Sequence, residues 1–137
     1  MKKYILYILF LAFVISFASC RKKTENKLVG KWELAWLEKN ENPEIKKIWT
    51  ITDGSAIIET NTGDDGSITE EKGYYFVEKN GFDVFYINIY ELFNKTSLTY
   101  NGKYRIIELN DEILAIQQVF DTHGNYAFRR LEFTRIE

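Results

Sequence analysis

The feature that most constrains the fold is a strand-like alternation that begins at Gly30. Trp32, Leu34 and Trp36 fall on one side of an extended chain, and Lys31 and Glu33 fall on the other. This period of two residues is typical of a half-buried strand. A glycine directly before a large indole lets the backbone pass close to another part of the chain. We therefore predict a strand whose Trp32 plugs one end of a closed sheet.

Turn signals divide the rest of the chain into similar short segments. Asp53-Gly54, Asn80-Gly81 and Asn110-Asp111 are typical of tight hairpin turns. Residues 61–72 and 91–102 are predicted as long loops, although residues 97–100 could form a further short strand. The predicted strands cover residues 31–39, 45–52, 55–60, 74–78, 82–90, 103–109, 112–120 and 126–136.

These segments predict an all-β protein. No segment with helical periodicity is long enough to serve as a crossover, which favours an antiparallel meander, and such a sheet removes its exposed edges most simply by closing. The abundance of aromatic residues (3 Trp, 9 Tyr and 10 Phe) and the single Pro agree with strands rather than helices. We expect one domain, residues 28–137, folded as an eight-stranded antiparallel up-and-down barrel.

The N-terminus has the order of features found in export signals. A basic head, Met1-Lys2-Lys3, precedes an apolar run from Tyr4 to Phe17, and small residues lead to Cys20, which is the only cysteine. This segment resembles a bacterial lipoprotein signal peptide. The resemblance implies that residues 1–19 are cleaved, that the Cys20 sulfur carries diacylglycerol and that its new amino group carries an acyl chain. A retained membrane helix is the alternative, but the apolar stretch is shorter than the ~20 residues that a bilayer requires.

Residues 20–27, which begin with Cys20, form a short polar segment. We predict that this segment is a lipidated tether. Its basic run, Arg21-Lys22-Lys23, either contacts anionic headgroups or is a solvated linker. Removal of residues 1–19 takes away two Lys and no acid, so the mature chain has a formal charge of −4. A mildly acidic domain argues against nucleic acid as a partner.

Short motifs along the chain, taken in order, resemble the lipocalin-like domains of bacterial lipoproteins. The resemblance covers residues 28–136 and implies that the first-strand Trp lies at the closed end of the barrel, where an Arg from the last strand packs across it. These roles fall to Trp32, preceded by Gly30, and to Arg135, with Arg129 as the second choice. The motifs are Gly30-Lys31-Trp32, Asp53-Gly54-Ser55, Gly73-Tyr74-Tyr75, Tyr104 to Leu109 with Leu114-Ala115-Ile116, and Phe133-Thr134-Arg135.

Two functions from different classes fit this reading. The first is an envelope lipoprotein, anchored in the outer membrane and facing the periplasm, whose barrel binds or carries a small hydrophobic or amphipathic molecule. Such a ligand would enter between the two long loops and contact Tyr75, Phe85 and Tyr90, each of which could equally be plain core. The second is an interaction lipoprotein whose barrel is filled by its own side chains and whose surface contacts another envelope protein.

Catalytic and metal-binding patterns are weak. The single histidine, His123, lies in a turn sequence without a second imidazole or a cysteine nearby in the sequence. Asp64-Asp65-Gly66 resembles a calcium loop, but Gly63 and Lys72 occupy positions that need ligands. We therefore expect no enzyme activity, no cofactor and no metal.

Overall fold

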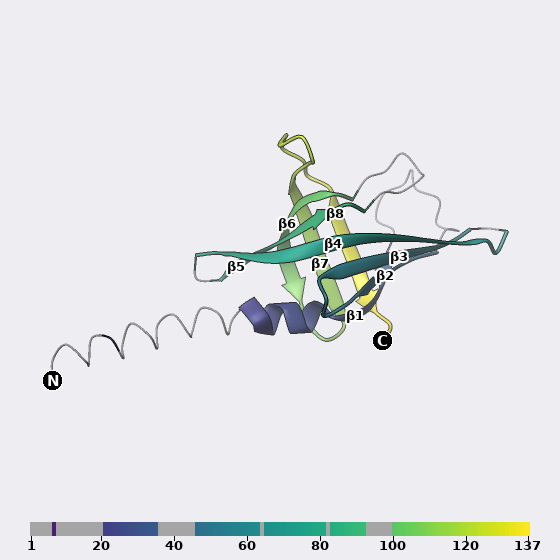
Figure 1. Cartoon of the computed structure of the whole chain (residues 1–137), viewed down its shortest axis with the longest axis horizontal. Helices are drawn as coiled ribbons and strands as arrows, with labels where there is room; N and C mark the ends of the chain where they lie inside the picture. Colours follow the sequence, from purple (N-terminus) through teal and green to yellow (C-terminus); the bar gives the residue numbers. More distant parts are fainter. Residues whose placement is uncertain (1–6, 8–20, 36–45, 64, 82, 93–99) are drawn as a thin grey trace.

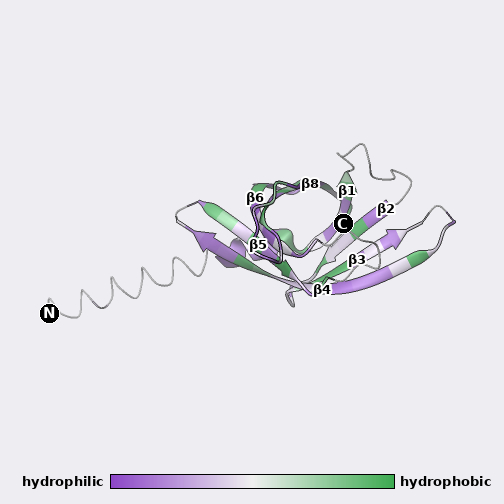
Figure 2. Ribbon diagram, turned by 90° about the horizontal axis from the view of Figure 1, so that it is seen from above, coloured by the Kyte–Doolittle hydropathy of each residue, from purple (hydrophilic) through white to green (hydrophobic). Residues whose placement is uncertain are grey.

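The computed structural model describes residues 7, 21–35, 46–63, 65–81, 83–92 and 100–137. The described residues form eight antiparallel strands in a closed barrel, in which each strand pairs with its neighbours in sequence and the last strand pairs with the first (Figures 1 and 2). The predicted all-β up-and-down barrel is therefore confirmed. The strands are β1 (Gly30–Ala35), β2 (Lys46–Ile51), β3 (Ala56–Thr62), β4 (Ile68–Asn80), β5 (Val84–Tyr90), β6 (Gly102–Leu109), β7 (Ile113–Phe120) and β8 (Arg130–Arg135).

The barrel closes where β1 lies between β2 and β8. Trp32 is opposite Trp49 of β2 on one side and opposite Arg135 of β8 on the other. Alternate residues of every strand point inward, and the apolar ones form one continuous core. The largest fully buried side chains are those of Trp32, Trp49, Tyr100, Tyr104 and Phe133.

The prediction of a long loop at residues 61–72 is wrong, because β3 and β4 extend through most of this segment. Thr62 pairs with Ile68, and residues 63–67 make the connection. The Gly63 amide donates to the Ser67 carbonyl at 2.9 Å and the Asp65 carboxylate accepts from the Ser67 amide at 2.9 Å, which closes a compact turn. The segment looked like a loop because this hairpin extends beyond the core, as Figure 1 shows, and carries polar residues on both faces.

The last strand is shorter than predicted. β8 begins at Arg130, whereas the prediction began at Tyr126, which makes only an isolated bridge to Phe120. Tyr126 and Phe128 are 75% and 78% exposed, so the apolar residues that suggested a strand lie in the β7–β8 connection, outside the core.

Residues 21–28, which include most of the predicted tether, are helical. The helix lies across the end of the barrel at which β1 begins (Figure 1), and Leu28 at its end is fully buried. Within the described part of the chain, no helix is long and apolar enough to cross a membrane. Three predicted features lie outside the described residues: Cys20 with its signal-like stretch apart from Tyr7, the strand end at residues 36–39 and the edge at residues 97–99.

Candidate functional site

The three residues predicted to close the barrel meet at the helix end of the molecule. The Trp32 indole is fully buried, and its Nε1 donates to the Leu28 carbonyl at 2.8 Å. The Arg135 guanidinium lies 4.3 Å from the centre of the Trp32 ring, and its Nη1 and Nη2 donate to the carbonyls of Val29 at 3.1 Å and Lys27 at 2.6 Å. These contacts join the helix, β1 and β8 into one closed end.

Gly30 is required by this arrangement. Its φ is +145°, and a Cβ atom placed on it would lie 2.6 Å from Arg135 Nη1 and 2.7 Å from the Glu137 carbonyl oxygen. A side chain here would therefore displace the guanidinium from the indole. Arg129, the second choice for this role, instead lies over the ring of Tyr100, 5.6 Å from its centre.

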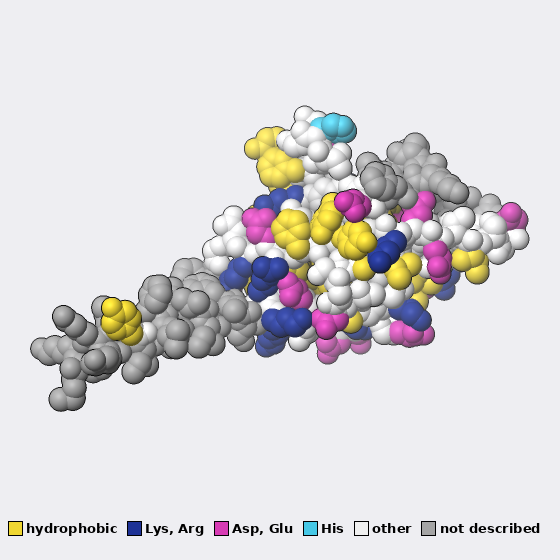
Figure 3. Space-filling view, in the orientation of Figure 1, with side chains coloured by type: hydrophobic (Ala, Val, Ile, Leu, Met, Phe, Trp, Pro, Cys, Tyr) yellow, Lys and Arg dark blue, Asp and Glu magenta, His cyan; other side chains and the backbone are white. Residues whose placement is uncertain are grey.

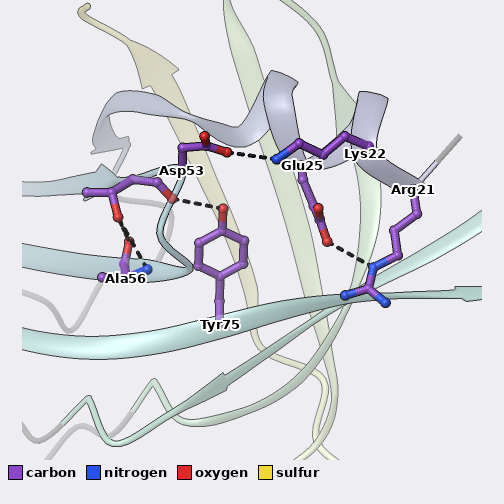
Figure 4. A network of polar contacts seen from close by, with 7 residues as sticks. Arg21, Lys22, Glu25, Asp53, Ala56 and Tyr75 are labelled. Atoms are coloured by element: carbon purple, nitrogen blue, oxygen red, sulfur yellow. Dashed lines mark hydrogen bonds and ion pairs between the residues drawn. The ribbon is translucent and has the colours of Figure 1, made fainter. Parts of the chain in front are cut away.

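Tyr75, the first predicted ligand contact, is a core residue at the same closed end. Its ring is 2% exposed, and its hydroxyl donates to the Thr52 carbonyl in the β2–β3 turn at 3.2 Å (Figure 4). Burial, together with the nearby carboxylates of Glu25 and Asp53, raises the pKa of the Tyr75 phenol to about 12.

The other two predicted contacts lie elsewhere. Tyr90 is 43% exposed on the outer face of the barrel, where its ring stacks on Tyr74 at 5.9 Å. Phe85 is half-buried near the β4–β5 turn, with the Lys79 ammonium 5.7 Å from its ring centre. The structure therefore does not bring Tyr75, Phe85 and Tyr90 together, since one lies in the core, one near the β4–β5 turn and one on the outer face.

The structure instead shows a polar cluster inside the barrel, centred on Glu59. Glu59 and Lys47 are both almost fully buried, and their charged groups are 3.2 Å apart. The second Glu59 carboxylate oxygen accepts from Trp49 Nε1 at 2.7 Å, and Asn61 Nδ2 donates to the first at 3.0 Å. We call these residues, together with Tyr100, the interior polar cluster.

Tyr100 connects the cluster to the aromatic core. Lys47 Nζ donates to its hydroxyl at 3.1 Å and lies 4.4 Å from its ring centre. The Trp49 indole meets the Tyr100 ring edge-on at 5.6 Å and packs against Phe133 at 4.6 Å. The Tyr104 hydroxyl donates to the Tyr100 carbonyl at 2.9 Å, and burial raises the Tyr104 pKa.

The interior polar cluster lies away from the closed end. On β2, Lys47 is four residues from Ile51, which is opposite Gly30 in the sheet. At about 3.3 Å per residue, this places the Lys47 backbone about 13 Å along the strand from the closed end. The cluster combines a cation, a carboxylate, a phenol and an indole N–H beside packed aromatic rings. These groups are able to bind the polar part of a small amphipathic molecule.

Sequence reasoning missed this cluster, although one signal pointed to it. Lys47 alternates with Trp49 and Ile51 on β2, and Glu59 alternates with Ile57 on β3, so both charges occupy inward positions of strands that were predicted. Charged residues in inward positions are rare and are therefore informative.

The other polar motifs have structural roles in the described residues. Asp121 caps the β7–β8 turn by accepting from the amides of His123 and Asn125, each at 2.8 Å, and these hydrogen bonds lower its pKa. His123 is exposed in that turn. Among the described residues, no group of three or more His, Cys, Asp or Glu side chains is placed to hold a metal ion.

Comparison with models of known protein families and with curated proteins gives no match.

Proposed function

We propose that the protein is a lipocalin-like lipoprotein of the cell envelope, anchored in the outer membrane through acylated Cys20 and facing the periplasm, whose barrel binds a small amphipathic molecule. The fold class supports the proposal, because an eight-stranded barrel is about wide enough for one small ligand. The packing of Arg135 across Trp32 at the closed end is the arrangement that the lipocalin resemblance implies.

The observation that carries the binding role is the buried Lys47–Glu59 pair. A buried ion pair loses about as much in desolvation as it gains in attraction, so apolar residues of similar size would stabilise the barrel at least as well. The pair is therefore better explained by a ligand than by stability. In this view, the polar group of the ligand contacts the interior polar cluster, and its apolar part packs among the rings of Trp49, Tyr100 and Phe133.

Native mass spectrometry of the mature lipoprotein, extracted from membranes in mild detergent, tests this role. We expect a small molecule to accompany the parent protein and to be lost from the K47M/E59L variant. The matched control is E33L/K46M, which removes the neighbouring surface ion pair and leaves the interior unchanged. Retention of the small molecule by K47M/E59L would contradict the proposal, and melting curves would verify that each variant is folded.

The exposed side chains of Tyr126 and Phe128 favour a second function. Both lie in the β7–β8 connection, and large exposed apolar side chains that adjoin each other often mark protein contacts. The protein would then be an interaction lipoprotein that contacts another envelope protein. Absence of any bound small molecule from the parent, together with a crosslinked envelope protein that is lost in Y126S/F128S, would favour this alternative.

A further inference from the structure

The helix of residues 21–28 packs on the closed end of the barrel. Lys22 forms an ion pair of 2.9 Å with Asp53 in the β2–β3 turn, next to the Thr52 carbonyl that holds Tyr75 (Figure 4). At the other end of the helix, Leu28 is buried, and its carbonyl accepts from Trp32. The helix therefore contacts the barrel at both of its ends.

The exposed side of this helix is basic. Lys23 and Lys27 are one helical turn apart, and neither has an ion-pair partner among the residues that the structure describes. Figure 3 shows Lys and Arg side chains at this end of the molecule, interspersed with Asp and Glu side chains. Beside the helix lies an open hollow of about 820 Å³, which we call the basic hollow; it is lined by Lys22, Lys23, Asn26, Lys27, Asp111 and Arg135.

The charges that line the basic hollow favour an anionic partner. The lining has four cationic side chains and one carboxylate, that of Asp111 in the β6–β7 turn. Lys22 is paired with Asp53 and Arg135 donates to two carbonyls, so the charges available to a partner are those of Lys23 and Lys27. Lys and Arg close to a membrane surface are attracted to anionic headgroups. Cys20 directly precedes Arg21, the first described residue of this helix, and one position corresponds to about 3.8 Å of chain. An acyl chain on Cys20 would therefore hold the helix itself at the bilayer surface.

We infer that the barrel rests with its closed end on the membrane, so that the helix lies on the headgroups and the basic hollow binds their anionic phosphates. This inference rests on the proposed acylation of Cys20. In this orientation the β7–β8 connection is directed away from the bilayer, where a partner can reach it from the periplasm.

Fluorescence quenching in reconstituted vesicles tests the orientation. Acylation consumes the only thiol of the chain, so the mature lipoprotein accepts one added cysteine at a chosen place. E112C marks the β6–β7 turn at the closed end, and H123C marks the β7–β8 connection. Each is labelled with a fluorophore and reconstituted in phosphatidylcholine vesicles containing phosphatidylglycerol and a lipid with a spin-labelled headgroup. We expect several-fold stronger quenching at position 112 than at position 123.

Charge reversal separates the orientation from the anchor. K23E/K27E in the E112C protein should lose most of the quenching, because each lysine near an anionic surface changes the docked population about fivefold. It should still float with the vesicles, since the acyl chains are intact. The matched control, K46E/R105E, reverses two exposed charges on β2 and β6 and should keep the parent quenching.

The outcomes that contradict the two proposals differ. Equal quenching at both positions, or stronger quenching at position 123, in protein that floats with the vesicles would overturn the orientation and leave the anchor standing. Failure of the purified mature protein to float would overturn the acylation of Cys20, and the orientation would fall with it. Unchanged quenching in K23E/K27E would show that the basic hollow does not bind headgroups.

Discussion

Arg135 is the residue through which the last strand holds the closed end together. R135M keeps an apolar stem over Trp32 but removes the donors to the carbonyls of Val29 and Lys27. We expect the free energy of unfolding to fall by about 1–3 kcal/mol, since hydrogen bonds from a charged donor contribute this much. Urea unfolding measures the change. R130M, which removes an exposed ion pair, is the control and should stay within about 0.5 kcal/mol of the parent.

The interior ion pair should show strong coupling between its two members. K47M or E59L alone leaves one charge in the barrel without its partner there, and we expect each to cost about 3–5 kcal/mol. The double variant K47M/E59L removes both charges and should cost less than the sum of the two. A double-mutant cycle by urea unfolding gives the coupling. Additive losses would mean that Lys47 and Glu59 do not act as a pair.

Tyr75 should contribute to alkaline unfolding. An unfolded tyrosine ionises with a pKa of about 10, whereas burial raises the pKa of folded Tyr75 to about 12. The stability that comes from burying the neutral phenol is therefore complete below pH ~10 and is lost as the pH rises towards 12. In Y75F the free energy of unfolding should fall less steeply over this range. Y126F, altered at an exposed tyrosine, should follow the parent curve.

The alternation of inward and outward residues along each strand explains which parts of the site could be predicted from the sequence. It correctly placed Arg135 on the inward face with Leu131 and Phe133, and that arginine lies over Trp32. The same parity argues against Tyr90 as an interior residue, because Ile87 and Ile89 point inward on β5. The ligand prediction relied on aromatic content and loop position instead, and neither property reports which face of a strand a side chain occupies.

At the scale of the elements, Gly73 allows the chain leaving β5 to lie against β4. A Cβ atom on Gly73 would lie 2.6 Å from the Leu92 Cβ and 2.8 Å from the Leu92 amide nitrogen, and a backbone atom cannot move aside cheaply. We expect G73A to lower the free energy of unfolding by about 1–3 kcal/mol through overpacking. G54A has no comparable clash, because its nearest neighbour is 3.8 Å away. A melting curve of G73A that matches that of G54A would contradict this reading.

The elements themselves were predictable where apolar alternation and tight turns coincide. β2, β5, β6 and β7 lie within about two residues of their predicted bounds. The β3–β4 hairpin was not predictable in this way, because its outer half is stabilised by backbone pairing between strands that bury few side chains. Without an apolar face, such strands have no periodic signal.

At the scale of the whole molecule, the anchor can be tested by removing one sulfur atom. C20S should keep its signal peptide or be processed differently, because lipoprotein maturation requires the cysteine. We expect the intact mass of the protein to lose its acyl groups and its partition into membranes to fall. The same processed mass and the same complete membrane partition in C20S would contradict the lipoprotein assignment.

The seam between β1 and β8 has a consequence for the order in which the protein forms. Leu34 of β1 lies opposite Phe133 of β8, so the first strand to be synthesised completes its hydrogen bonds with the last one. During the synthesis of the intervening strands, β1 has one unpaired edge, and unpaired edges associate with other chains. Contacts so distant along the chain also make folding slow. Closure of the barrel is therefore a late event, and until then the free edge of β1 is open to pairing with other chains.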